Sequence, residues 1–164
     1  MKLTIEHIIV GAAWVLTALA LWRWVPRDRN GLRKAHVAFF FKQMITWLFG
    51  LLVVEWGLIS YPIHEFEHAN MTSFTFEFFV YPAICTFYNV YYPATQSYFQ
   101  EFLYTALFCS PITLLEVVLE KYTDLIHYNQ WTWYWTWITL YLTFRMSRAY
   151  VKWFYSNPDT PHQP

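Results

Sequence analysis

The chain has 164 residues, and its 11 basic and 11 acidic side chains leave no formal net charge. Hydrophobic residues make up 57% of it and charged residues only 13%, whereas a soluble domain carries about 25% charged residues. The composition therefore excludes an ordinary soluble domain, and the balanced charge gives no indication of a nucleic-acid partner.

The apolar residues come in five long segments, each about as long as a membrane-spanning helix. We place the spans at residues 3–25, 37–61, 73–92, 101–120 and 129–148. The fold class that we predict is therefore all-α, an integral membrane bundle of five transmembrane helices that forms a single domain over residues 1–155. Residues 156–164 are polar and rich in proline, which predicts a disordered tail.

A basic stretch follows the first span, at residues 26–34. Because its basic residues come after the apolar run, the first span does not match a secretory signal peptide, in which they precede it. Proline, asparagine and glycine in the stretch predict a turn. Loops rich in lysine and arginine stay in the cytoplasm, so the stretch predicts that the N-terminus lies outside.

The second span carries two ionisable residues. Lys42 lies near its basic end, where we expect the ammonium group to reach the membrane surface. Glu55 lies deeper in the span and needs a polar partner. A Tyr-Pro dipeptide is expected to end this helix at residue 61, because proline disfavours helical geometry in the residue before it.

The third span contains Glu77 near its start and Pro82 near its middle. Pro82 has no backbone N–H, so it frees the carbonyl oxygen of Phe78 four residues earlier. The Tyr-Pro dipeptide recurs at 61–62, 81–82 and 92–93. We interpret this recurrence as punctuation of the helices.

The fourth span has a polar stripe. Its members are spaced by three or four residues and fall on one side of a helix: Thr105, Cys109, Thr113, Glu116 and Glu120. A carboxylate that faces lipid costs several kcal/mol. The stripe therefore predicts a helix packed in a bundle, with Glu116 inside. The two cysteines, Cys85 and Cys109, are interpreted as small hydrophobic residues of this bundle.

The fifth span begins with a run of aromatic residues, 131–137, which is typical of the membrane interface. A second polar stripe follows its length: Asn129, Thr132, Thr136, Thr139, Thr143 and Ser147. Small hydroxyl residues at this spacing allow helices to approach closely and to hydrogen-bond to one another. We expect this stripe to face the stripe on the fourth span.

The distribution of basic residues predicts the orientation in the membrane. With the 26–34 loop in the cytoplasm and the five spans alternating, nine of the 11 lysine and arginine residues lie on the inner side. This bias follows the positive-inside rule. It predicts an N-terminus outside and a cytoplasmic C-terminus.

The loop after the second span contains His64-Glu65-Phe66-Glu67-His68, which matches the H-E-x-x-H pattern of zinc proteases. The pattern fixes few positions and arises by chance in a segment rich in histidine and glutamate. His64 and His68 are weak candidates for metal ligands, and a loop that responds to pH or binds metal adventitiously is the favoured alternative. We predict no enzymatic activity and no cofactor.

Three glutamates share one depth in the predicted bundle. At 1.5 Å per residue, Glu55, Glu77 and Glu116 each lie roughly 8–9 Å outside the bilayer midplane. Buried carboxylates that cannot all stay ionised must share protons, hold a cation or receive a basic partner. The hypothesis is an ion- or proton-binding site of these glutamates, assisted by Thr113 and Thr132. The alternative is that each glutamate is satisfied separately by threonine, tyrosine or tryptophan donors.

The function that we predict is cation or proton binding in a small transporter or channel. The alternative is a non-catalytic membrane subunit or scaffold, whose polar stripes serve helix packing and partner binding. Five spans make a thin bundle, so a path for solute predicts a homo-oligomer or a membrane partner protein. The lipid bilayer is the other expected partner.

The C-terminal half also resembles a known family. The resemblance rests on Ser110-Pro111-Ile112-Thr113 leading to Glu116, and on Lys121-Tyr122-Thr123, Leu125-Ile126, Tyr128 and the segment 131–134. These motifs are similar to an uncharacterised family of small multi-pass membrane proteins from Bacillus- and Clostridium-type bacteria. The resemblance implies a bacterial cytoplasmic membrane and transfers no catalytic residues.

Overall fold

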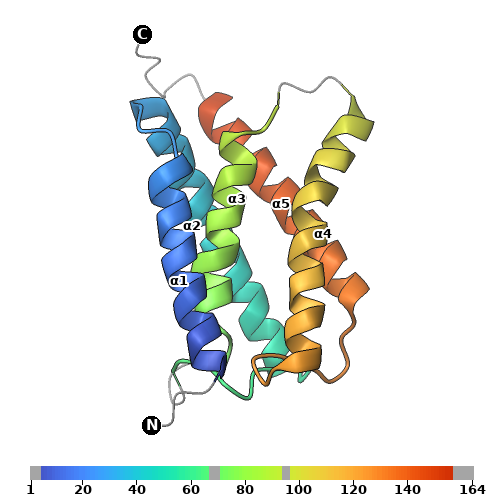
Figure 1. Ribbon diagram of the computed structural model, residues 1–164. Coiled ribbons are helices and arrows are strands. Elements are labelled where there is room, and N and C mark those ends of the chain that lie inside the picture. Colours follow the sequence, from blue (N-terminus) through green and yellow to red (C-terminus); the bar gives the residue numbers. More distant parts are fainter. Residues whose placement is uncertain (1–4, 67–70, 94–96, 157–164) are drawn as a thin grey trace.

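The computed structural model describes residues 5–66, 71–93 and 97–156, and these residues form an all-α bundle (Figure 1). The five α-helices are α1 (Ile5–Trp24), α2 (Arg29–Glu55), α3 (Tyr81–Val90), α4 (Tyr98–Tyr122) and α5 (Trp133–Ser156). A π-helical segment, η1 (Thr75–Val80), leads directly into α3. Two strands of two residues, β1 (Ile59–Ser60) and β2 (His127–Tyr128), complete the described elements. The predicted all-α class with five helices is confirmed.

The helices run alternately up and down, and α5 crosses obliquely behind α4 and α3 (Figure 1). We call the end where α1 ends and α2 begins the basic end, and the opposite end, which holds β1 and β2, the ribbon end. α5 ends at the basic end, and α1 begins at the opposite end (Figure 1). The alternation follows the predicted order of spans.

Three of the described helices, α1, α2 and α4, are long and apolar enough to cross a membrane. The run of η1 and α3 that replaces the third span is shorter, at six and ten residues. α5 has 24 residues but carries three basic residues in its second half. The structure therefore supports a membrane protein with several spanning helices.

The boundaries of the second span were wrong at both ends. α2 begins at Arg29, inside the predicted 26–34 loop, because the Asp28 carboxylate caps it by accepting the backbone N–H of Gly31 at 2.9 Å. α2 ends at Glu55, before the predicted end at 61, because Gly57 turns the chain with a φ of 66°. The N–H groups of Gly57 and Leu58 bond to carbonyls of the last helical turn, a Schellman arrangement.

The other predicted boundaries shift by smaller amounts, except at the end of α5. The helix continues to Ser156, eight residues past the predicted end at 148, so the predicted tail begins on a residue that is still helical. Residues 157–164 lie outside the described part of the chain.

The start of η1 is capped by a residue of the H-E-x-x-H motif. The Glu65 carboxylate accepts the backbone N–H groups of Phe74 and Thr75 at 3.1 and 3.0 Å. These N–H groups precede the first helical hydrogen bonds and need an acceptor. Glu65 therefore satisfies the N-terminus of a helix.

The π-helical segment η1 ends at Val80, two residues before Pro82. Pro82 leaves the carbonyl of Phe78 without its helical partner, and the Gln43 side chain from α2 donates to that oxygen at 2.9 Å. The predicted free carbonyl is therefore satisfied, and the bond attaches α2 to η1.

The ribbon end is closed by the pairing of β1 with β2, in which Ile59 is opposite Tyr128. The backbone N–H groups of Asn129 and Gln130 also donate to the carbonyl of Leu58, both at 3.1 Å. This pairing joins the connection after α2 to the connection between α4 and α5. It places Tyr128 beside the end of α4.

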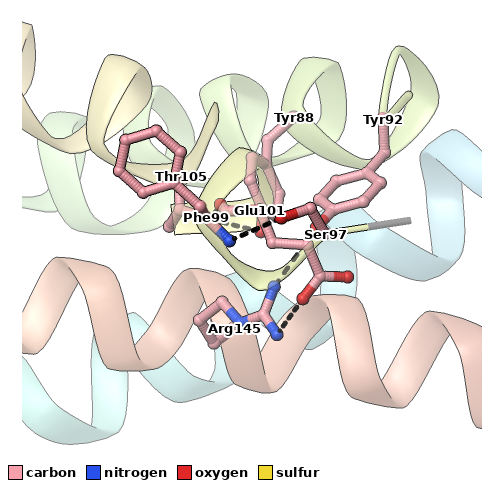
Figure 2. A network of polar contacts seen from close by, with 7 residues as sticks. All are labelled: Tyr88, Tyr92, Ser97, Phe99, Glu101, Thr105 and Arg145. Atoms are coloured by element: carbon pink, nitrogen blue, oxygen red, sulfur yellow. Dashed lines mark hydrogen bonds and ion pairs between the residues drawn. The ribbon is translucent and has the colours of Figure 1, made fainter. Parts of the chain in front are cut away.

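Near the opposite end, Arg145 of α5 joins the segment that follows α3 to α4 (Figure 2). Its guanidinium donates to the Glu101 carboxylate at 2.7 Å and to the Tyr92 hydroxyl at 3.2 Å. The hydroxyls of Tyr88 and Thr105 lie 3.0 Å apart in the same network. The apolar core lies beside it and contains Cys85 and Cys109, both free and buried, as predicted.

Candidate functional site

Glu116 lies inside the bundle, as the stripe predicted, with 7% of its surface exposed. Three hydroxyl groups from three elements donate to its carboxylate. The Tyr81 hydroxyl of α3 donates to Oε2 at 3.1 Å, and those of Tyr128 in β2 and Thr136 in α5 donate to Oε1 at 2.7 and 2.8 Å. The predicted contact between the stripes of α4 and α5 is thus confirmed at Glu116 and Thr136.

The donors of Glu116 are themselves held in place. The Trp131 indole N–H donates to the Thr136 hydroxyl oxygen at 2.8 Å, which leaves the hydroxyl proton for Glu116. Burial raises the pKa of Tyr128, so this phenol stays protonated and donates at physiological pH. Glu116 is therefore satisfied by neutral donors.

Glu77 is the second buried carboxylate, with 4% of its surface exposed. The Tyr61 hydroxyl donates to its Oε1 at 3.0 Å. Its Oε2 is buried and accepts no hydrogen bond from the residues that the structure describes. Buried carboxylate oxygens are normally hydrogen-bonded, so this atom marks a place for a proton or another bound group.

Gly50 of α2 provides the space for the Glu77 side chain. A Cβ atom at position 50 would lie 2.0 Å from Oε2 and 2.3 Å from Cδ of Glu77. Only a residue without a side chain allows the carboxyl group to rest on the backbone of α2.

Glu77 and Glu116 belong to one buried cluster, which we call the carboxylate pair. Glu77 lies within electrostatic range of the Glu116 carboxylate. The Tyr61 and Tyr81 hydroxyls, which bond to one carboxylate each, also lie within electrostatic range of the second. Neither of the two ion pairs among the described residues involves the pair, so no basic side chain neutralises it there.

The other residues of the predicted site are placed differently. Glu55 is the last residue of α2 and is exposed, so the predicted layer of three glutamates reduces to two. Thr113 is buried but donates its hydroxyl to the carbonyl of Cys109 at 3.0 Å. Thr132 precedes α5, and its buried hydroxyl has no hydrogen-bond partner among the described residues. No described contact joins these three residues to the carboxylate pair.

Lys42 was expected to reach the membrane surface, but it is 1% exposed. Its ammonium group donates to the Thr143 hydroxyl at 2.5 Å and lies 4.6 Å from the centre of the Phe144 ring. Close packing of α2 against α3 and α5 encloses the side chain. Because α2 begins at Arg29, Lys42 is the middle residue of the helix and lies 13 residues from either end, too far for its side chain to reach the surface.

The histidines of the motif do not form a described metal site. The Nδ1 of His64 is 2.7 Å from the carbonyl oxygen of Tyr61, and its Nε2 is buried without a hydrogen-bond partner in the described part of the chain. His68 lies outside the described residues. The glutamate that a protease would use as a base, Glu65, caps η1.

The tyrosine donors were missed in the sequence, although a signal for them was present. Tyr61, Tyr81 and Tyr92 are the tyrosines of the three Tyr-Pro dipeptides. The first two donate to the carboxylate pair, and the third accepts from Arg145. A proline ends or bends a helix, so the preceding tyrosine can turn toward a charged group in the interior.

Substitution of Gly50 by alanine is expected to destabilise the bundle by about 1–3 kcal/mol, the usual effect of overpacking. The added methyl group must displace the buried Glu77 carboxyl group, and this outweighs the gain in helix propensity of about 1 kcal/mol. Denaturation in mixed micelles measures the change.

The double variant Gly50→Ala with Glu77→Ala is the control, because it removes the obstructing carboxyl group. The second substitution is expected to recover most of the loss caused by the first. Additive effects of the two substitutions would contradict the contact.

Comparison with protein-family models, with curated proteins and with solved structures finds no match for the chain. Its resemblance to the Bacillus and Clostridium family therefore stays a prediction. The function has to be argued from the carboxylate pair and its surroundings.

Proposed function

We propose that the protein is a multi-pass membrane protein that binds and releases a proton at Glu77, within a small transporter or channel. The observation that carries this proposal is the Glu77 Oε2 atom, which is buried and has no hydrogen-bond partner in the described structure. A buried carboxylate with a second carboxylate nearby and no basic partner is stabilised by taking up a proton. The protonated form of Glu77 is thus favoured.

A proton suits this site better than a metal cation. Hard cations such as Ca²⁺ take six or more oxygen ligands, whereas the described hydrogen-bonding neighbours of Glu77 are the side chains of Tyr61 and Thr72. The oxygens of Glu116 already accept three hydrogen bonds. Glu116 therefore acts as the fixed neighbour whose charge favours protonation of Glu77.

Polar side chains continue from the carboxylate pair toward the basic end. On α5, Thr136 bonds to Glu116, Thr143 to Lys42 of α2, and Ser147 to Asn89 of α3. At 1.5 Å per residue these three positions cover about 16 Å of α5. We call this series the polar line, and it supports a path for protons through the bundle.

The proposed orientation has five spans, an outer N-terminus and a cytoplasmic C-terminus. It is supported by the alternating helices and by the basic residues around the ends of α1 and α5 and the start of α2. The ribbon end, with the carboxylate pair, then faces outward. The proposed location is a bacterial cytoplasmic membrane.

The proton on Glu77 can be tested with a hydrophobic carbodiimide, which reacts with protonated carboxyl groups in apolar surroundings. We expect the peptide that contains Glu77 to be modified in the purified protein, and the modification to decrease as the pH rises. Mass spectrometry of the digested protein measures it. Glu77→Gln should abolish the modification, and Glu55→Gln, which changes an exposed carboxylate, should leave it intact.

Transport is tested in vesicles that contain the protein and a pH-sensitive dye. Under an imposed membrane potential, wild-type protein and Glu55→Gln should admit protons, and Glu77→Gln should not. A Glu77 that resists modification at every pH would contradict proton binding. Vesicles with wild-type protein that admit protons no faster than empty vesicles would contradict transport.

A non-catalytic subunit is the second candidate, and one observation favours it. Every oxygen of the Glu116 carboxylate is satisfied by a donor from another element, as a purely structural carboxylate would be. This function predicts stable association with a second membrane protein. Purification in a mild detergent, followed by measurement of the particle mass, distinguishes it from a homo-oligomeric transporter.

A further inference from the structure

An open groove of about 820 Å³ lies at the basic end, between the first turns of α2 and the last turns of α5. Four basic side chains line it: Arg33 and Lys34 from α2, and Arg148 and Lys152 from α5. One acidic side chain, Asp28, also lines it. The carboxylate of Asp28 is engaged, because it caps α2 through the N–H of Gly31.

The basic side chains of this groove lie close together, and none of them makes a described ion pair. One carboxylate, Glu101, lies within electrostatic range of Arg148 and Lys152, but it is paired with Arg145. Lys34 and Arg148 are both half-buried and close enough to repel one another. The ion pairs among the described residues involve Arg145 and His127, and neither of these lines the groove. Like charges at close range destabilise a fold unless an anion lies between them.

Two buried donors in the groove also have no acceptor. Arg148 Nε and Tyr155 Oη are buried and make no hydrogen bond to the described residues. The Arg148 guanidinium stacks on the Tyr92 ring, 4.0 Å from its centre, which fixes the plane of its donors. Arg33 lies within electrostatic range of Tyr155. The groove thus offers positive charge and two donors that no described residue satisfies.

We propose that this groove binds a phosphate group, with Arg148 and Lys34 as its main ligands and Tyr155 as a further donor. A planar guanidinium beside an ammonium matches the oxygens of a phosphate. Two sources carry this chemistry: the headgroup of an anionic phospholipid and a free phosphate in solution. The groove lies at the end of the bundle that the basic residues assign to the cytoplasmic membrane surface, where anionic headgroups gather.

The alternative to a binding site is that these basic residues only set the orientation of the protein in the membrane. In that case they would be exposed and equivalent to one another. Arg33, Lys34 and Arg148 are instead partly buried in one groove, and Arg148 is fixed against an aromatic ring. The site does not involve the carboxylate pair, so it stands independently of the proposed proton binding.

The test compares two variants that remove the same charge from the same end of the molecule. Lys34→Gln with Arg148→Gln changes the groove, and Arg23→Gln with Arg27→Gln changes basic residues that do not line it. Native mass spectrometry of the detergent-solubilised protein measures binding of phosphatidylglycerol, of phosphatidylcholine and of inorganic phosphate. Each variant is first shown to be folded by size-exclusion chromatography.

We expect phosphatidylglycerol to bind the wild-type protein and the Arg23/Arg27 variant equally, and the Lys34/Arg148 variant at least about tenfold more weakly. Binding of phosphatidylglycerol without inorganic phosphate identifies a lipid headgroup as the ligand. Binding of inorganic phosphate that depends on Lys34 and Arg148 identifies a free phosphate. Equal losses in both variants, or no loss in the groove variant, would overturn the proposal.

Tyr155→Phe provides a second variant if the double change in the groove does not fold. It removes one hydroxyl group and leaves every charge in place. Weaker binding of the same ligand in Tyr155→Phe supports the site. Unchanged binding in this variant, together with equal binding of phosphatidylglycerol and phosphatidylcholine, would count against it.

Discussion

Replacement of Glu116 by leucine is expected to destabilise the bundle by at least about 3 kcal/mol. The leucine would leave three hydroxyl groups, on Tyr81, Tyr128 and Thr136, without their acceptor. Each buried donor that loses its partner costs about 1–3 kcal/mol. Equilibrium denaturation of the variant in mixed micelles, followed by far-UV circular dichroism, measures the loss.

Glu120→Leu is the matched control, because Glu120 lies one turn later on the same stripe but is only half-buried. No described hydrogen bond involves its carboxylate, so its replacement should change the free energy of unfolding by less than about 0.5 kcal/mol. Glu116→Gln keeps one acceptor oxygen and should lie between the two. A Glu116→Leu variant as stable as Glu120→Leu would show that the three hydroxyls find other partners.

The burial of Glu116 could be predicted because spacing on a single helix reports which side faces the protein. Thr105, Cys109 and Thr113 share that side, and all of them are buried. The same argument predicted the contact between α4 and α5 at Thr136. It did not predict that Thr143 and Ser147 would turn to α2 and α3, because α5 crosses the bundle obliquely.

The partners of the carboxylates could not be predicted by spacing. Tyr61 reaches Glu77 only because Gly57 ends α2 early and β1 pairs with β2. These are contacts between segments far apart in the chain, and no pattern within one span encodes them. The predicted depth of Glu55 inside the span was wrong for the same reason. The turn at Gly57 ends α2 at Glu55, so this residue lies at the end of the helix.

The sequence contained a signal for the start of α2 at Arg29, but the cluster of basic residues there was interpreted as a loop. Asp28 is a residue type that favours the N-cap position, and it precedes a long helical stretch. The cluster of basic residues indicated a solvated loop. The structure shows that these residues begin the helix, and this places Arg33 and Lys34 on the wall of the groove.

Replacement of Lys42 by methionine is expected to stabilise the bundle by about 1–4 kcal/mol, as removal of buried charges from packed interiors does. Methionine has a similar length and fills the same space without an ammonium group. Lys42 is 1% exposed, and its described contacts are the Thr143 hydroxyl and the Phe144 ring, with no carboxylate. A buried ammonium group without a carboxylate partner lowers stability.

A residue that lowers stability is retained when the activity of the protein depends on it. Lys42 lies on the polar line, between the layers of Glu116 and Asn89. We therefore expect Lys42→Met to lose proton uptake in vesicles while it gains stability. Carbodiimide modification of Glu77 should persist, because Lys42 does not contact that residue.

Lys121→Met is the control for the loss of one lysine, since Lys121 is exposed at the end of α4. Its stability and proton uptake should match those of the wild-type protein. A Lys42→Met variant that is less stable than the wild type would show that the interior compensates the ammonium charge, and Lys42 would then be a structural residue. Gain of stability with loss of uptake would identify Lys42 as part of a path that leads from the carboxylate pair toward the basic end.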